Sequence, residues 1–174
     1  MGDVDRCAQC GFEYDLADAE SAGPAIVVGV SQFAGLLRAG GSDLRHRTQP
    51  DIWSPLEYGC HMRDVLLVQR ERVLAARCID TPSFEPMGRD DRVEHDGYID
   101  QDPGDVARQM TDAATLFRNV VARLDDADWQ RHVVYNFPSA LERSLRWVAV
   151  HTLHEVRHHL LDVRRQLTPR ADDA

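Results

Sequence analysis

Three histidines carry the clearest chemical signal in this sequence. His154 and His158 are four residues apart in a segment with helical periodicity, so their imidazoles project from one face, about 6 Å apart along the helix axis. His61 lies far upstream, on the same apolar helical face as Tyr58 and Val65. Imidazole donors favour Zn, Ni, Fe or Cu over Mg or Ca. The sequence therefore predicts one divalent metal ion bound by His61, His154 and His158, with zinc expected first and nickel second, and with open positions for water or substrate.

Other polar side chains surround these histidines. Glu155 is a candidate general acid or base if its side chain reaches the metal. Asp162, one turn beyond His158, is placed to accept the outer ring proton of a liganding histidine, or is simply an exposed carboxylate. His151 and His159 are interpreted as residues beside the site or on the surface, because His159 falls one residue off the predicted ligand face.

The histidine helix also contains the His-Glu-x-x-His motif of zinc proteases, in which the glutamate is the general base. The extended protease pattern would place glycine at position 161 and histidine at 164, where this chain has Leu161 and Arg164. These departures count against a protease. Chance spacing in a histidine-rich helix is the other alternative.

A pair of cysteines precedes the first predicted helix. Residues 7–12 read CAQCGF, which is half of a zinc knuckle, and a complete site needs two further ligands. A redox pair or an unliganded terminus would also fit the pattern. The residues that could complete a zinc site are Cys60, Cys78, His46, His95 and His132.

Helical periodicity predicts the elements that position these residues. Ser54 is placed to cap a helix that begins at Pro55. No alternating apolar and polar run is long enough for a sheet, so the expected fold class is all-α, a four-helix bundle. The polar, turn-rich residues 80–103 predict a long surface connection that partly covers the site. The predicted helices span 25–38, 55–78, 104–124 and 143–167.

Composition bounds the class of protein. The chain has 174 residues, which suits one core, and we expect an N-terminal segment over 1–24, the bundle over 25–167 and a flexible tail over 168–174. A net charge of -9 argues against nucleic acid as a partner. The N-terminus lacks the pattern of a signal peptide, and no uninterrupted apolar run approaches the roughly 20 residues of a membrane span. With four cysteines, too few for a disulfide scaffold, this predicts a cytoplasmic protein with no membrane partner.

Two segments together resemble the DinB/YfiT-like superfamily, which includes mycothiol-dependent maleylpyruvate isomerases. They are residues 53–61 (WSPLEYGCH) and residues 151–159 (HTLHEVRHH), within a likeness that covers about 25–167. The resemblance implies a four-helix bundle with up-down-down-up connectivity and a three-histidine metal site. The matching positions in this chain are His61, His154 and His158.

The resemblance also implies an activity. Members related to bacterial low-molecular-weight thiols act as thiol S-transferases or thiol-dependent isomerases, in which the metal lowers the pKa of the thiol. We therefore expect a metal-dependent thiol S-transferase or hydrolase acting on a small molecule, with a low-molecular-weight thiol as cosubstrate and a homodimer as the assembly. The alternative is a non-catalytic metal-binding or stress-response module. A pocket beside an open metal position would favour the enzyme.

Overall fold

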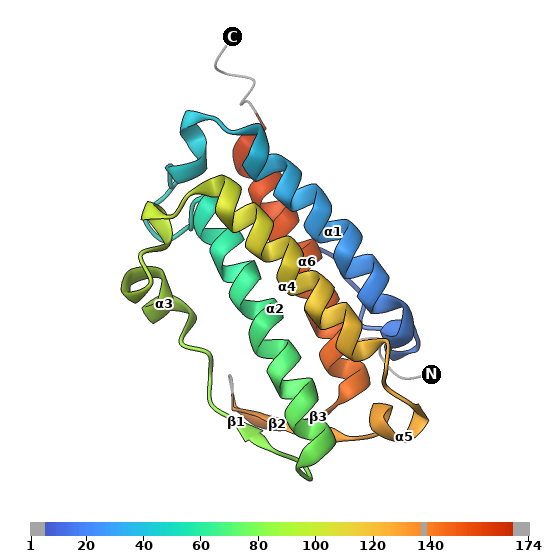
Figure 1. The fold of residues 1–174 in the computed structure, drawn as a ribbon. Coiled ribbons are helices and arrows are strands. Elements are labelled where there is room, and N and C mark those ends of the chain that lie inside the picture. The colour runs from blue at the N-terminus through green and yellow to red at the C-terminus, as the bar shows by residue number, and fades with distance from the viewer. Residues whose placement is uncertain (1–5, 137–138, 169–174) are drawn as a thin grey trace.

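The computed structural model describes residues 6–136 and 139–168, and within them four long helices form a bundle (Figure 1). The predicted C-terminal tail, apart from Thr168, lies outside the described residues. Helices α1 and α2 each pack against both α4 and α6, whereas α1 and α2 contact each other little. In Figure 1, α1 and α6 run in one direction along the bundle and α2 and α4 run in the other. The long helices are α1 (Ala19–Ala39), α2 (Pro55–Cys78), α4 (Pro103–Val121) and α6 (Leu145–Leu167).

Short elements connect the helices, and some of them are strands. Strand β1 pairs in parallel with β2, and β2 pairs antiparallel with β3, so the expectation of an all-α fold was wrong at this end of the bundle. In β2, Val133 and Tyr135 are buried while their neighbours are partly exposed, which is the alternation of a strand over only five residues. The short elements are η1 (Leu16–Asp18), η2 (Ser42–Arg45), β1 (Ser83–Phe84), α3 (Arg89–His95), η3 (Tyr98–Asp100), α5 (Asp126–Trp129), β2 (His132–Asn136) and β3 (Ala140–Ser144).

The start of α2 is fixed by polar contacts. The Ser54 side chain accepts a hydrogen bond from the Glu57 backbone N–H at 3.3 Å, and the Glu57 carboxylate accepts one from the Ser54 N–H at 2.7 Å. This reciprocal capping box confirms the predicted cap and first residue of α2. Arg47 donates to the same carboxylate at 2.8 Å. His61 follows one helical turn after Glu57.

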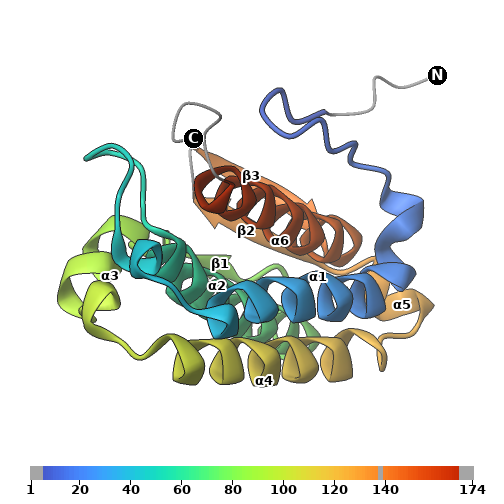
Figure 2. The same ribbon diagram turned by 90° about the horizontal axis from the view of Figure 1, so that it is seen from above.

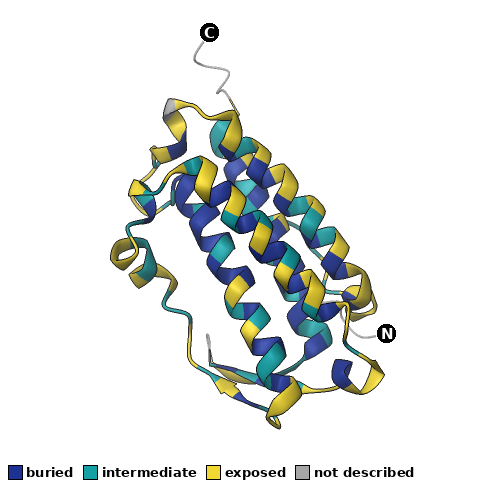
Figure 3. Ribbon diagram, in the orientation of Figure 1, coloured by how far each residue is buried: buried dark blue, intermediate teal, exposed yellow. Residues whose placement is uncertain are grey.

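The first helix begins earlier than predicted, at Ala19 rather than at residue 25. Pro24 lies inside the helix, which continues through it because Ala19, Ala22 and Ile26 are fully buried in the core. Figure 3 shows the buried residues gathered on the inner faces of the helices. By length and composition the segment Leu16–Ala39 could also cross a membrane. In this fold its apolar face packs against α4 and α6, as an ordinary core helix does.

Close packing of α1 against α6 gives the first testable prediction. A Cβ atom at Gly29 would lie 2.7 Å from Val156 Cγ1, and a β-branched side chain in a helix has one favoured rotamer and cannot turn away. Overpacking costs about 1–3 kcal/mol and the helix propensity of alanine returns about 1 kcal/mol. We expect Gly29→Ala to lower the free energy of unfolding by about 1 kcal/mol in urea denaturation. Gly35→Ala, on the same helix with open space around it, should cause no loss.

Candidate metal centre

Helix α6 presents two neighbouring faces with metal-binding side chains. Consecutive residues on an α-helix are about 100° apart around the axis, whereas residues four apart lie on one face. His151, Glu155 and His159 therefore share one face, and His154 and His158 share the next. The first of these faces is directed toward α2, and the second is directed toward the N-terminal segment.

The first cluster consists of His61, Glu155 and His159. Their candidate ligand atoms all lie within 4.8 Å of one another. His159 Nε2 is 3.7 Å from Glu155 Oε2, close to the roughly 3.4 Å that separates two ligands of one tetrahedral zinc. The rings of His61 and His159 have centroids 5.2 Å apart. Two helices thus bring two imidazoles and one carboxylate to a common point.

His61 is in the state that metal binding requires. Its side chain is only 3% exposed, as predicted from its apolar face, and the ring of Trp53 packs edge-on against it at 5.0 Å. Burial, the largest influence, lowers the pKa of His61 to about 3, so the ring is neutral. Its Nδ1 atom is buried and has no hydrogen-bond partner among the described residues. A buried, neutral ring with an unpaired nitrogen fits a metal ligand.

Glu155 and His159 carry complementary charge. Burial opposes ionisation of Glu155, but contacts with His154 and His159 outweigh it and hold the pKa of the carboxyl well below its usual range. Burial likewise opposes protonation of His159, yet Asp162 and Glu155 raise its pKa to about 8. Asp162 Oδ2 lies 3.2 Å from His159 Nδ1, which leaves Nε2 directed at Glu155. A metal ion would replace the proton between these two groups.

The second cluster consists of Cys7, Cys10, His154 and His158, whose candidate ligand atoms also lie within 4.8 Å of one another. Cys7 Sγ is 3.6 Å from His158 Nδ1. Burial tends to raise the pKa of the Cys7 thiol, but hydrogen bonds, chiefly from the backbone of Cys10 and Gln9, outweigh it and lower the pKa to about 6. Both predicted helix ligands therefore lie beside the N-terminal cysteines.

The structure divides the predicted ligand set between the two clusters. His61 does not meet His154 and His158, so the expectation that these three histidines share one ion is corrected. His159, which the sequence placed off the ligand face, is the residue that faces His61. Glu155, predicted as an acid or base, lies inside the cluster itself. Glu155 and His159 are four residues apart, as His154 and His158 are. Because the first of them is a glutamate, a pattern of two paired histidines does not include them.

Further close groupings on α6 come from that helix alone. One turn of a helix offers ligands from one side only, so such a grouping does not surround an ion. Asp162 touches both clusters, since its Oδ2 atom is 3.5 Å from His158 Nε2 and 3.2 Å from His159 Nδ1. Asp162 is therefore placed to accept a proton from the ring nitrogen of each histidine that points away from its cluster, as the sequence suggested for His158. These groupings are His151 with His154 and Glu155, and His158 with His159 and Asp162.

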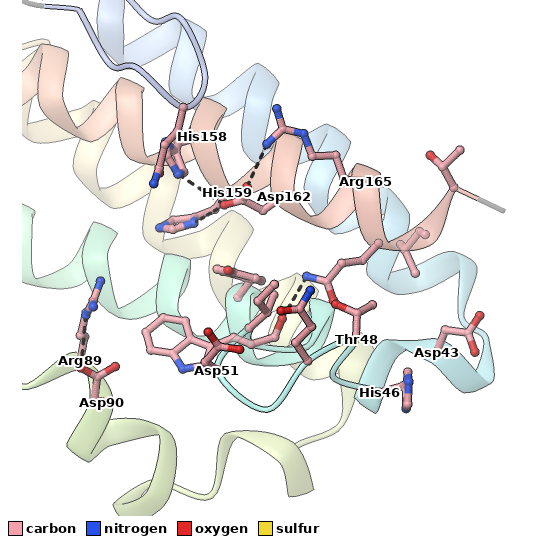
Figure 4. Close-up of a pocket in the computed structure, with 18 residues that line it drawn as sticks. Asp43, His46, Thr48, Asp51, Arg89, Asp90, His158, His159, Asp162 and Arg165 are labelled. Carbon is pink, nitrogen blue, oxygen red and sulfur yellow. Dashed lines mark hydrogen bonds and ion pairs between the residues drawn. The ribbon is translucent and has the colours of Figure 1, made fainter. Parts of the chain in front are cut away.

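A cavity of about 570 Å³ opens onto the first cluster. His61 and Glu155 form part of its wall, and residues 86–91 of the connection between α2 and α4 form another part, which agrees with the predicted cover. A larger hollow of about 1080 Å³ reaches His159 from the other side. Figure 4 shows His158, His159 and Asp162 along one side of this hollow and Arg89 and Asp90 across from them. The smaller cavity is also lined by Val65, Val68, Gln69, Arg72, Tyr135, Leu141, Arg143, Trp147 and His151.

Fold and cluster together define a helical-bundle protein with a candidate metal site between two of its long helices. The model of the DinB superfamily matches residues 33–163, so the chain belongs to that superfamily. Its structure is similar to YfiT from Bacillus subtilis, with a TM-score of 0.75, 13% sequence identity, and coverage of 87% of this chain and 88% of that one. YfiT is described as a probable metal-dependent hydrolase with an unusual four-helix bundle topology. At this identity the likeness establishes the fold. A search of curated proteins found no match.

Proposed function

We propose that this protein is a metal-dependent hydrolase whose ion is held by His61, Glu155 and His159. The convergence of these three side chains within 4.8 Å, at the wall of a cavity, carries the proposal. Two histidines and a glutamate are the protein ligands of catalytic zinc sites that keep one position open. The description of YfiT supports the same class. Zinc is the leading ion, and nickel also suits the imidazole donors.

When bound, the metal supplies a Lewis acid that lowers the pKa of a water or thiol and polarises a carbonyl group. The chain's own residues prepare the site for it. Trp53 covers His61 and excludes water from that side. Asp162 accepts from His159 Nδ1 and so fixes which nitrogen faces the cluster. In this arrangement Glu155 acts as a ligand and not as the free acid or base that its place in the sequence suggested.

The cavity suits a small organic molecule with an anionic group. Its walls include the apolar side chains of Val65 and Trp147, and also Arg72 and Arg143. Arg72 packs over the ring of Tyr135 at 4.4 Å, and its buried Nε has no hydrogen-bond partner within the described part of the chain. A guanidinium held against an aromatic ring with a free donor is a good partner for a carboxylate.

A thiol S-transferase is the second candidate, and the size of the cavity favours it. A volume of about 570 Å³ lies within the range of pockets that enclose a drug-sized ligand, so a thiol cosubstrate has room beside the ion. The two activities differ only in the nucleophile. A non-catalytic metal-binding module has no need of this cavity, which counts against it.

The chemistry can be tested on protein purified without a histidine tag and loaded with zinc or nickel. We expect turnover of esters or amides that carry a carboxylate, a loss of at least about 100-fold on chelation, and recovery when the metal returns. A hydrolase works in buffer alone, whereas a transferase needs an added low-molecular-weight thiol and converts the acyl group of the substrate into a thioester, with release of the alcohol or amine. Turnover that survives complete removal of the metal would contradict the proposal, as would inactivity of the loaded protein on every substrate with and without thiol.

A further inference from the structure

We infer that Cys7, Cys10, His154 and His158 form a second metal site, a closed zinc site that clamps the N-terminal segment to α6. The sites share no ligand, and this one goes beyond the proposed function. Its four candidate ligand atoms lie within 4.8 Å of one another. A Cys-x-x-Cys pair with a His-x-x-x-His pair matches the ligand spacing of structural zinc sites. The residues that the sequence suggested as partners, Cys60 among them, lie elsewhere.

The backbone around the cysteines is folded into a tight turn. The Gly11 N–H donates to the Cys7 carbonyl at 2.8 Å, and the Cys7 N–H donates to the Phe12 carbonyl at 2.9 Å. Gly11 has a φ of 74°, in the left-handed region that favours glycine. An antiparallel bridge between Arg6 and Glu13 closes the turn. The turn brings both cysteine sulfurs to the same side, toward α6.

The distances between side chains match those of a metal site. Zinc binds sulfur at about 2.3 Å and nitrogen at about 2.0–2.1 Å, so a sulfur and a nitrogen on one tetrahedral zinc are about 3.6 Å apart. Cys7 Sγ lies 3.6 Å from His158 Nδ1. Figure 2 shows the N-terminal segment on the side of α6 that faces away from α4, outside the bundle interior.

The two histidine rings are oriented as ligands. His154 is 8% exposed, its Nδ1 is 2.7 Å from the Tyr14 hydroxyl, and its Nε2 is buried with no hydrogen-bond partner in residues 6–136 and 139–168. His158 directs Nδ1 at Cys7 and Nε2 at Asp162, 3.5 Å away. Each ring thus has one nitrogen on a protein group and the other turned into the cluster, as in other metal sites. A disulfide between the cysteines would leave those inner nitrogens unpaired.

Four protein ligands leave no open position, so the site is structural. The clamp holds Tyr14 against α6, where its hydroxyl is 2.7 Å from His154 Nδ1 and 3.0 Å from His151 Nδ1. His151 lines the cavity beside the first cluster. The second site therefore also fixes part of the cavity wall.

Metal content and a cobalt spectrum test this inference on the tag-free chain. We expect two zinc ions per chain by elemental analysis, one fewer in Cys10→Ser, and no change in Cys78→Ser, which alters an exposed cysteine. Cobalt in the wild-type chain should give a near-ultraviolet charge-transfer band from thiolate ligands. Cys10→Ser should weaken that band strongly, while His61→Ala should leave it intact.

Three outcomes would overturn the inference. They are a cobalt-loaded wild type without a thiolate band, an unchanged zinc content in a folded Cys10→Ser variant, and a mass two hydrogens lighter that reveals a Cys7–Cys10 disulfide. The cobalt band needs no variant, so it decides the matter even if Cys10→Ser fails to fold. A strong band together with a zinc content that His61→Ala leaves unchanged would sink the proposed function and leave this site standing.

Discussion

Replacing His159 by alanine should remove the ion from the first cluster, formed by His61, Glu155 and His159, and should lower turnover at least about 100-fold. His159 faces both His61 and Glu155, so its loss leaves two ligands and removes one charged partner of the Glu155 carboxylate. Changes to groups that merely support a ligand cost roughly 10–100-fold in metal affinity or activity, and loss of a ligand exceeds that range. Elemental analysis and turnover measured on the same preparation give the result.

Variants of other histidines show whether this result is specific to His159 or is a general effect of losing an imidazole. His158→Ala should lose one zinc and the cobalt–thiolate band, whereas His159→Ala should lose one zinc and keep the band. His132→Ala, which changes a half-exposed ring paired with Glu142, should keep both ions. If His159→Ala retained the full metal content and full turnover, the assignment of this residue would be wrong.

Arg47→Ala should lower the free energy of unfolding by about 3 kcal/mol, the largest stability effect that we expect from one surface-reaching side chain. The Glu57 carboxylate is 3% exposed and Arg47 is 35% exposed. Removal of the arginine therefore leaves a buried charge whose partner is gone, and it also weakens the capping box that starts α2. Because Arg47 is partly solvated, the value belongs at the lower end of the range for buried pairs.

The pH dependence of this loss follows from Glu57. Burial tends to raise the pKa of Glu57, but Arg47 and the Ser54 contacts outweigh it and lower the pKa below its usual value. Stability from a lowered carboxyl pKa is present above the unfolded value of about 4.3 and is lost as the pH falls through the folded pKa. Urea denaturation should therefore show the full gap between wild type and variant near neutral pH and a narrowing gap below about pH 4.

A surface pair provides the control for this experiment. Arg108 and Asp105 are both well exposed, so Arg108→Ala should cause no measurable loss. Equal stability of wild type and Arg47→Ala at neutral pH would show that the Glu57 carboxylate does not depend on its ion pair.

Local patterns predicted the bundle well and the small sheet not at all. The cap at Ser54 and the bounds of α2 follow from residues adjacent in sequence, and both are confirmed. Strand β2 has only five residues, and its pairing with β1 joins segments about fifty positions apart, which no local window contains. Helix α1 begins before the predicted residue 25 and continues through Pro24, because burial of Ala19 and Ala22 outweighs the local preference.

The candidate site was predicted in part, and the error has a geometric cause. His61 was identified correctly as a buried residue, although this part of α2 is buried on most of its sides and does not present one distinct inner face. On α6, Leu153 and Val156 are also buried, so apolar neighbours do not show which face of the helix carries the ligands. The predicted pair, His154 and His158, is therefore one residue away from the pair that faces His61. The contact that occupies His158 comes from Cys7, 151 residues earlier in the chain. Only the folded chain brings those groups together.

Anomalous diffraction from crystals of the tag-free protein, recorded at the absorption edge of the bound metal, locates the ions directly. We predict one peak between His61, Glu155 and His159, and a separate peak between the N-terminal cysteines and the His154–His158 pair. A single peak that joins His61 to His154 and His158 would contradict the account. A metal-loaded crystal with no peak beside His61 would contradict it equally.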